Sequence, residues 1–321
     1  MGAILHLLNM VMPPSKSSGG TNRLVYWLAA EQARHGHKVY VGSPEGESTT
    51  FFEHIRLSGN RTFDDLKTKM PADVTDVELH EMPWDIATWV YDNYPRSFTV
   101  IHSGVVPEYV PAGGWSGSKA VFVSRSHMEN AGGAQFAYNG VPVEEYEYCE
   151  AKADYLLVLA KVKRSKKGVQ TAMRVAKRCR RKLIVAGGVR RGSPTTWFPW
   201  HPLIRPIGYV DGQRKRDVLS KASALLVPIR WEEPFGLTVI EAMLSGTPVI
   251  AFRRGAMPEL IVDGVTGFLC DTEDEMVEAV SRLPNIAPQA CRRHVIEKFS
   301  ATAMYKRHQA LLDLAGAGTI W

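Results

Sequence analysis

Short apolar runs alternate with longer amphipathic stretches along most of the chain. Runs of about four to eight apolar residues between turn residues are typical of buried parallel strands, and apolar positions recurring about every three or four residues are typical of helices. The predicted strands are Ala3–Met10, His37–Val41, Phe98–Ile101, Val121–Ser124, Tyr155–Ala160, Leu183–Ala186, Leu225–Ile229 and Val249–Phe252. The predicted helices are Leu24–Gly36, Thr49–Leu57, Ile86–Tyr94, Val169–Arg181, Asp217–Ala222, Leu237–Ser245, Asp274–Leu283 and Ala301–Leu314. This alternation predicts α/β domains built on parallel sheets.

Length and local charge predict how the chain is divided. It has 321 residues, which exceeds the size of one ordinary hydrophobic core and favours two domains. The acidic stretch Glu144–Asp154 precedes the strand Tyr155–Ala160 and marks the expected boundary. We therefore predict a first domain over residues 1–150, a second over 151–296, and a terminal helix with a tail over 297–321.

Composition narrows the class of protein. Apolar residues make up 45% of the chain, the usual share for a globular protein. No apolar run approaches the roughly 18 residues of a membrane span, and the apolar start lacks the basic residues and cleavage site of a signal peptide. The 4 cysteines are scattered without a Cys-x-x-Cys pair, so neither a disulfide framework nor a zinc site is indicated. The expected location is the cytoplasm.

The candidate chemistry is concentrated in residues 225–272, which are expected to form strand, loop, helix and strand. The first amides of a helix have no internal partner, and the helix dipole favours negative charge there. Such amides would come from Phe235, Gly236, Leu237 and Thr238, beside Glu233. Glu241 lies about two helical turns further along. Amides suit a phosphate and carboxylates suit hydroxyl groups, so a nucleotide-sugar fits this stretch. The alternative is an ordinary strand–helix–strand unit with solvated glutamates.

A second candidate lies near the N-terminus. Gly19-Gly20 falls between the strand Ala3–Met10 and the helix Leu24–Gly36. A glycine turn in that place can hold phosphate with exposed amides. The alternative is a flexible turn that binds no ligand.

Several of these motifs together resemble a known family. The run Glu233-Pro-Phe-Gly-Leu-Thr-Val-Ile-Glu241, followed by Gly246-Thr-Pro-Val and by Gly255, Glu259, Gly264 and Gly267, is similar to the donor site of retaining glycosyltransferases of family 4. Gly19-Gly20-Thr-Asn-Arg23 resembles the opening of those enzymes, and Asn139-Gly-Val-Pro142 resembles their turn before the linker. The resemblance implies the GT-B fold, which has two Rossmann-like domains facing a cleft. The acceptor would bind mainly to the first domain and the donor to the second, with the terminal helix crossing back to the first.

The resemblance also assigns roles to single residues. His102, directly after a predicted strand, would contact the transferred sugar, while a buried structural histidine is the alternative. Lys167 matches the family's lysine that neutralises the leaving diphosphate. The family's arginine is absent, and Lys161 is its nearest match, although lysine lacks the bidentate fork of arginine. The loop ending at Val210 would touch the nucleotide base.

The implied activity is transfer of a hexose with retained anomeric configuration from a UDP- or GDP-type sugar to an unidentified acceptor. Glu233 would hold the hydroxyl groups of the sugar, and Glu241 the ribose. No further cofactor is expected. No Asp-x-Asp sequence occurs, which argues against a metal-dependent enzyme, so no metal site is predicted.

Charge is unevenly distributed along the chain. The net charge is +6, and residues 161–191 hold thirteen Lys or Arg without any Asp or Glu. The rest therefore carries 6 − 13 = −7. Arg174, Lys177, Arg178 and Arg181 would share one helix face. This face has three interpretations: a solvated surface, a contact with an anionic membrane, or a nucleic-acid site, which tryptophans near Trp197 could extend by stacking.

Three rival functions stay open. The first is a basic nucleic-acid-binding protein with a catalytically decayed glycosyltransferase fold, which would depend on residues 161–191 rather than on Glu233. The second is an NAD enzyme, but Gly187-Gly188 lacks the G-x-G-x-x-G spacing. The third is a phosphorylase on the same fold, which the shortness of the chain disfavours.

Overall fold

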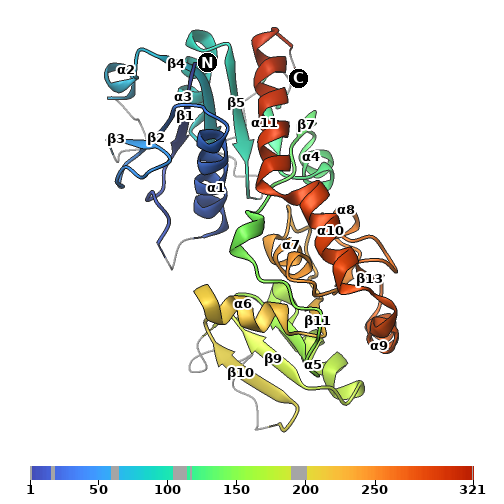
Figure 1. Ribbon diagram of the computed structural model, residues 1–321. Helices are drawn as coiled ribbons and strands as arrows, with labels where there is room; N and C mark the ends of the chain where they lie inside the picture. The colour runs from blue at the N-terminus through green and yellow to red at the C-terminus, as the bar shows by residue number, and fades with distance from the viewer. Residues whose placement is uncertain are drawn as a thin grey trace. The chain divides into compact units, whose positions relative to one another are not determined.

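The protein is described by a computed structural model that covers residues 2–15, 19–58, 65–103, 114–115, 118–188, 201–319 and 321. Its chain forms two compact units (Figure 1), Met1–Val141 with Ala301–Trp321, and Pro142–Ser300. The boundaries predicted near residues 150 and 296 both fall inside the second of these units.

The first unit is built on a parallel sheet in the order β3-β2-β1-β4-β5-β6-β7. The strands are β1 Ala3–Leu8, β2 Val39–Ser43, β3 Glu53–Arg56, β4 Val74–His80, β5 Arg96–Ile101, β6 Ala120–Phe122 and β7 Gln135–Phe136. The helices are α1 Gly20–Arg34, α2 Leu66–Lys69, α3 Trp84–Asn93, α4 Arg125–Ala131 and α11 Ala301–Gly316. The strand order reverses between β1 and β4, which makes that pair the topological switch point of the sheet.

The middle of this sheet is unusually polar on one face. β1 is buried along its whole length, and its apolar residues pack into cores on both sides of the sheet. In β4, however, the buried side chains of Asp76, Glu78 and His80 occupy alternate positions. Alternate residues of a strand point to the same face, so these three side chains lie together. Buried charges need partners, and helices that cover the face supply them.

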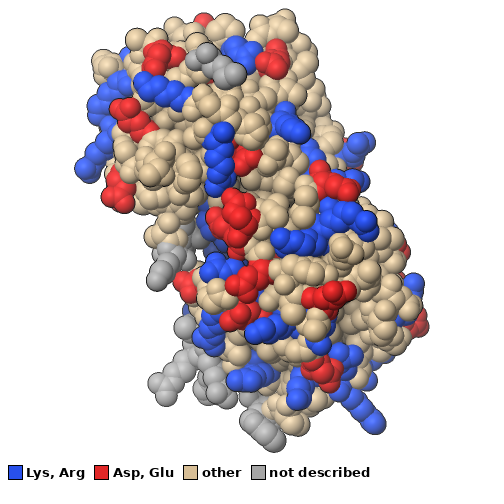
Figure 2. All heavy atoms as spheres, in the orientation of Figure 1, with Lys and Arg blue, Asp and Glu red and all other residues tan. Residues whose placement is uncertain are grey.

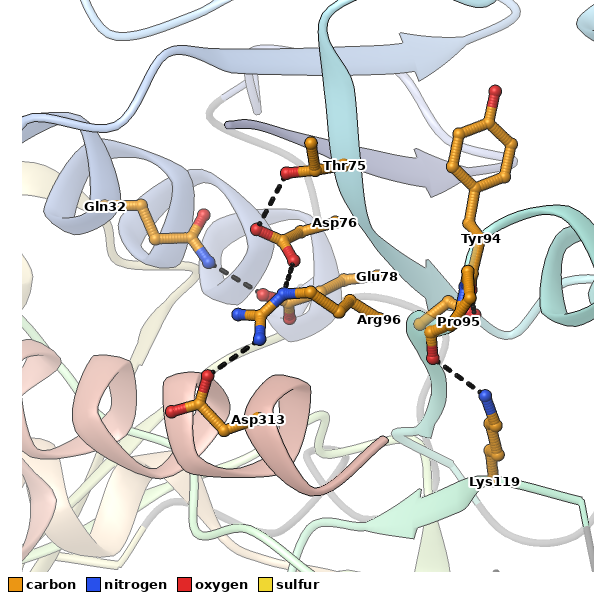
Figure 3. Close-up of polar contacts among 10 residues, drawn as sticks. Gln32, Thr75, Asp76, Glu78, Tyr94, Pro95, Arg96, Lys119 and Asp313 are labelled. Atoms are coloured by element: carbon orange, nitrogen blue, oxygen red, sulfur yellow. Dashed lines mark hydrogen bonds and ion pairs between the residues drawn. The ribbon is translucent and has the colours of Figure 1, made fainter. Parts of the chain in front are cut away.

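The terminal helix α11 provides one set of partners. It packs against α1 and β5 (Figure 1). Figure 3 shows Arg96 of β5 bridging two carboxylates, Asp76 in the sheet and Asp313 on α11, with 2.9 Å between Arg96 Nη1 and Asp313 Oδ1. Thr302 of the same helix donates to Glu31 of α1 at 2.6 Å. The last helix of the sequence is therefore part of the first unit.

The second unit repeats the same architecture. Its parallel sheet has the order β10-β9-β8-β11-β12-β13. The strands are β8 Leu156–Leu159, β9 Leu183–Ala186, β10 Ile204–Gly208, β11 Ala224–Val227, β12 Val249–Phe252 and β13 Gly267–Cys270. The helices are α5 Val169–Arg178, α6 Gly212–Ser220, α7 Leu237–Leu244, α8 Met257–Leu260, α9 Glu273–Arg282 and α10 Pro288–Phe299, with 3₁₀ turns η2 Val143–Glu145, η3 Ser165–Lys167 and η4 Leu283–Asn285. Here the strand order reverses between β8 and β11.

Two local predictions were wrong. The segment 49–57, expected to be helical, contains the edge strand β3, whose two end residues, Glu53 and Arg56, are exposed. Helix α1 begins at Gly20 rather than at Leu24. Gly19 and Gly20 therefore form the start of a fifteen-residue helix instead of a turn before it. This change leaves their backbone amides at a helix N-terminus, where the dipole favours an anion.

Candidate functional site

The candidate site of the second unit lies where its strand order reverses. In open α/β sheets, ligands bind beyond the carboxyl ends of the strands at this point. The loop after β8 carries Lys167, and the loop after β11 carries Glu233. The two loops touch through their backbones: Arg230 donates to the Lys166 carbonyl at 3.2 Å. A Cβ atom at Gly168, where φ is +69°, would lie 1.8 Å from the Pro228 carbonyl oxygen, so only glycine permits this approach.

This approach brings together two residues that the sequence predicted for the site. Lys167 Nζ lies 2.5 Å from Glu233 Oε2, and the two side chains are 21% and 16% exposed. The Trp231 ring supports the same loop, because its centroid lies 3.5 Å from Lys166 Nζ and 5.1 Å from Lys167 Nζ. A cation close to an aromatic face is stabilised by the ring. The site thus presents one partly buried cation and one partly buried carboxylate side by side.

The start of α7 adjoins this pair. Gly236 forms the cap of the helix with φ of +102°, a left-handed conformation that favours glycine. Gly255 packs closely against the loop that carries Glu233, because a Cβ atom at Gly255 would lie 2.3 Å from the Glu233 backbone nitrogen. The next residue, Ala256, donates a hydrogen bond to the Glu233 carbonyl at 3.0 Å. Phe235 is buried, while Gly236, Leu237 and Thr238 are half-buried. These contacts hold the backbone of Glu233 where its loop leads into the first turn of α7.

Glu241 has a different environment from Glu233. Its side chain is fully buried on α7. Its Oε1 accepts from the Tyr146 hydroxyl at 2.7 Å and lies 2.6 Å from Nζ of Lys215, a residue of α6. These contacts join α6, α7 and the segment after η2. The contact with ribose that the resemblance implied for Glu241 stays a prediction, and the structure adds an internal ion pair to its role.

Two further predicted residues of this unit lie in the loops after β8 and β10. Lys161 begins the loop after β8, and its side chain is exposed. Val210 follows β10 and is 5% exposed. The adjoining glycines bring this loop close to its neighbour, with Gly187 donating to the Gly208 carbonyl at 2.8 Å. The contact of this loop with the nucleotide base stays a prediction.

In the first unit, His102 directly follows β5. Its backbone N–H and that of Ser103 both donate to Oε1 of Glu81, at 3.1 and 2.6 Å. Glu81 follows β4 and has φ of +53°, a conformation that non-glycine residues adopt rarely and that often accompanies functional sites. The carboxylate of Glu81 thus fixes the backbone position of His102.

The His102 ring is held from one side. Its Nε2 lies 3.0 Å from Nδ1 of His80, and the two rings are stacked with centroids 5.2 Å apart. Its Nδ1 is shielded from solvent and has no hydrogen-bond partner among the residues that the structure describes. Burial lowers the pKa of His102 to about 4, although the nearby Glu81 carboxylate acts in the opposite direction. The ring is therefore neutral near pH 7.

Sequence reasoning missed the polar group next to His102. His6, Glu78 and His80 could each offer a ligand atom within 4.8 Å of the others. Each nitrogen and carboxylate oxygen of these side chains, however, already has a hydrogen-bond partner. We therefore assign the group to a hydrogen-bonded network and not to a metal centre. The alternation of polar residues in Asp76-Val-Glu-Leu-His80 was the signal that could have revealed it.

The basic helix face of α5 is largely paired. Arg174 forms an ion pair with Glu273, and Arg178 Nη2 lies 2.5 Å from Asp274 Oδ1. Both acidic residues lie in the first turn of α9. Helix α5 ends at Arg178 and not at Arg181 as predicted, so Arg181 lies beyond the helix face, and its Nη2 is 2.7 Å from Asp154 Oδ1. Figure 2 shows acidic and basic side chains intermingled over the face drawn. These contacts favour the solvated surface among the three interpretations. Arg190, Arg191 and Trp197 lie outside the described residues.

This pairing leads to a testable expectation for α5. We expect the protein to bind neither single-stranded RNA nor anionic vesicles measurably at about 0.15 M salt, because Arg174 and Arg178 on this face, and Arg181 just beyond the helix, already have carboxylate partners. The joint change Arg174→Gln and Arg178→Gln should lower the free energy of unfolding by about 0.5–2 kcal/mol, as expected for two exposed ion pairs. Lys177→Gln is the matched control.

The two binding experiments are fluorescence anisotropy over a salt series and vesicle sedimentation. Binding that weakens steeply with salt and is reduced by Lys177→Gln would contradict the expectation and support the nucleic-acid or membrane interpretation.

Comparison with known proteins adds to this geometry. A family model described as "Glycosyl transferases group 1" matches residues 153–285. Trehalose synthase from Pyrococcus horikoshii is 29% identical over 180 residues, which are 51% of this chain and 40% of that protein. D-inositol 3-phosphate glycosyltransferase from Corynebacterium diphtheriae is 35% identical over 107 residues, 30% of this chain and 25% of that protein. The chain thus matches less than half the length of either relative.

Solved structures match nearly the whole chain. AviGT4, a glycosyltransferase involved in avilamycin A biosynthesis, is 24% identical with a TM-score of 0.76, and the match covers 99% of both chains. Alr3699/HepE from Anabaena, solved with UDP-glucose, is 15% identical with a TM-score of 0.68 over 98% of this chain and 100% of its own. The predicted fold class, with two parallel-sheet α/β domains as in GT-B glycosyltransferases, is confirmed. No helix in the described part of the chain is long and apolar enough to cross a membrane.

Proposed function

We propose that this protein is a glycosyltransferase that moves a hexose from a nucleotide-diphosphate sugar to an acceptor, with retention of configuration and without a metal ion. The observation that carries the proposal is the Lys167–Glu233 pair beside the first turn of α7, at the switch point of the second sheet. The match of the group 1 glycosyltransferase model to this unit supports it. The acceptor is open: a small molecule, a glycan, a lipid or a modified nucleic acid would each fit.

The proposed chemistry follows from the charges at the site. When the bond between the sugar and the diphosphate breaks, negative charge grows on the leaving phosphate oxygen. Lys167 and the first-turn amides around Thr238 stabilise that charge, with Lys161 as a further cation of the same loop. Preorganised charge of this kind often contributes more to catalysis than any other single effect.

The remaining steps concern the sugar and the acceptor. Glu233 accepts hydrogen bonds from the hydroxyl groups of the sugar. The acceptor oxygen attacks the anomeric carbon from the side of the departing phosphate, a new carbon–oxygen bond forms, and the phosphate oxygen takes the acceptor proton. This front-side path preserves the configuration and needs no separate base. His102, with a neutral ring, contacts the sugar without supplying a proton.

A thermal-shift panel of nucleotide diphosphates tests the proposal. We expect one of UDP and GDP to raise the melting temperature well above the other, because stabilisation follows affinity: about 2.7 kcal/mol at a hundredfold excess over Kd. UDP and UDP-glucose form the first arm, since a structural neighbour was solved with both. Incubation with the preferred nucleotide-sugar should then release the diphosphate when an acceptor is added.

The matched control for this panel is the Lys167→Ala variant, tested with the nucleoside diphosphate and with the corresponding nucleoside. The substitution should reduce the melting-temperature shift caused by the diphosphate more than the shift caused by the nucleoside. A protein that responds to NAD and to no nucleotide diphosphate at millimolar concentration would rule the proposal out.

A further inference from the structure

A row of buried polar side chains crosses the first sheet and ends at His102. His6 lies on β1, Glu78 and His80 lie on β4, and His102 follows β5. The strand registers place these side chains on one face, at the switch point between β1 and β4. His6 and Glu78 are 0% exposed and His80 is 1% exposed. Polar groups this deep are retained only with well-matched partners.

The row is joined by a continuous set of hydrogen bonds. The contacts are His102 Nε2 to His80 Nδ1 at 3.0 Å, His80 Nε2 to His6 Nδ1 at 3.0 Å, His6 Nε2 to Gln32 Oε1 at 2.6 Å, Gln32 Nε2 to Glu78 Oε1 at 2.7 Å, and His308 Nδ1 to Glu78 Oε2 at 2.6 Å. Figure 3 shows the contact between Gln32 and Glu78. Gln32 comes from α1 and His308 from α11, so both helices that cover this face take part.

Chemistry fixes the direction of every bond in this row. An ionised carboxylate only accepts, so Gln32 must turn its NH₂ group to Glu78 and its oxygen to His6. His6 must then donate from Nε2, and a neutral ring accepts at its other nitrogen. His80 therefore donates from Nε2 to His6, and His102 donates from Nε2 to His80. The orientation of one amide and the tautomers of three rings follow from one carboxylate.

The charge states agree with this direction. Burial lowers the pKa of His6 and lowers that of His80 well below its ordinary value. Burial by itself would raise the pKa of the Glu78 carboxyl, but the adjoining His308 and His6 hold it below its ordinary value. The rings are thus neutral and the carboxyl is ionised near pH 7, as the assigned directions require.

We propose that Glu78, acting through Gln32, His6 and His80, holds His102 in the tautomer protonated at Nε2. This tautomer leaves Nδ1, which is shielded from solvent in this structure, as an acceptor for a hydroxyl of the sugar once the groups that cover it move aside. Nδ1 is the atom without a partner among the described residues. A ring fixed in this way accepts a hydrogen bond at Nδ1. It carries no proton at that atom, so it cannot act as an acid there. The part concerning sugar rests on the proposed function, whereas the tautomer does not.

The tautomer can be measured without any substrate. Protein labelled with ¹⁵N-histidine gives long-range ¹H–¹⁵N correlations that distinguish the two neutral tautomers and the cation. Signals of His6, His80 and His102 are assigned by loss in single His→Gln variants. We expect all three to be neutral and protonated at Nε2 at pH 7.5. A His102 ring protonated at Nδ1, or a cationic ring in the row, overturns the proposal.

Breaking the row at Gln32 tests whether the effect is transmitted. Gln32→Leu removes the acceptor of the His6 Nε2 proton, so the row should reverse and His102 should shift to the tautomer protonated at Nδ1. Glu78→Gln keeps the shape of the side chain and removes its negative charge. It replaces Gln32→Leu in this test if that variant does not fold. There we expect both tautomers of His102 to be populated. An unchanged His102 tautomer in the folded variant overturns the proposal.

A control and an elemental measurement complete this arm. Asp76→Asn changes a buried carboxyl on the same face of β4 that pairs with Arg96 instead, and it should leave the three tautomers unchanged. Elemental analysis of the purified protein should find no stoichiometric transition metal. A bound metal that disappears in His6→Gln would overturn the hydrogen-bonded assignment.

The activity arm uses the nucleotide-sugar that the protein accepts. Gln32→Leu should lower kcat by about 10- to 100-fold, the range that applies to groups orienting metal-bound histidines. His102→Asn places a carbonyl acceptor near the position of the ring Nδ1 but has no tautomer for Gln32 to control. Adding Gln32→Leu to His102→Asn should therefore cause no further loss of kcat. A full additional loss overturns the link to activity. Correct tautomers without any transfer would refute only the proposed function.

Discussion

Lys167→Ala is expected to lower the turnover of sugar transfer by about 100- to 1000-fold, the effect of removing one preorganised donor to a developing negative charge. The Lys167 ammonium is partly buried and lies 2.5 Å from Glu233, so its charge is less screened than that of an exposed lysine. The Michaelis constant for the donor should rise much less than turnover falls. Lys167→Arg should recover part of the rate because it keeps the charge.

Lys166 provides the matched control for this experiment. It is the preceding residue, it is exposed, and its ammonium lies over the Trp231 ring. Lys166→Ala should change turnover by less than about threefold, because an exposed cation held over an aromatic ring contributes little. Steady-state kinetics with the preferred nucleotide-sugar measure both variants. Equal losses in the two variants would mean that the wrong lysine has been assigned to the diphosphate.

Glu241→Ala is expected to lower the free energy of unfolding by about 3–5 kcal/mol, because it removes the buried carboxylate that pairs with the Lys215 ammonium. The side chains of Lys215 and Glu241 are 14% and 0% exposed. Glu241→Gln should cost less, since an amide oxygen still accepts from Tyr146. Urea denaturation measures both changes.

A double variant separates charge from packing at this place. Glu241→Leu with Lys215→Met removes both ions together, and such replacements are often nearly neutral in stability. Nucleotide affinity is then compared between folded Glu241→Gln and the double variant. If Glu241→Ala unfolds at the same urea concentration as the parent protein, the ion pair has no structural role and contact with ribose becomes the better account of Glu241.

Sequence alone predicted the fold class and most strands because buried parallel strands are apolar throughout. Leu183–Ala186 and Val249–Phe252 were predicted with their observed bounds. Strand β4 was missed because every second residue is polar, and partners from distant helices compensate those residues. Strand β3 was taken for a helix because it is only four residues long at the edge of the sheet, and so short a segment shows no clear period.

The candidate site shows the same limit. The Lys167–Glu233 pair was predictable in outline, because both residues follow strands that flank a switch point. The burial of Glu241 was not predictable from its place on α7, because it depends on Tyr146 and Lys215 from other parts of the chain. The histidine row was equally hidden, since its members are separated by up to 74 residues between bonded rings.

The Lys167–Glu233 pair also bears on which molecules the protein would ignore. A ligand that offers only an anion must compete with the Glu233 carboxylate for Lys167 and leaves that carboxylate unmatched. A ligand that offers an anion and hydroxyl groups together satisfies both members. On the proposed function, chloride, sulfate and other anions that carry no hydroxyl group would therefore be poor inhibitors, and the salt bridge would favour sugar-bearing diphosphates over them.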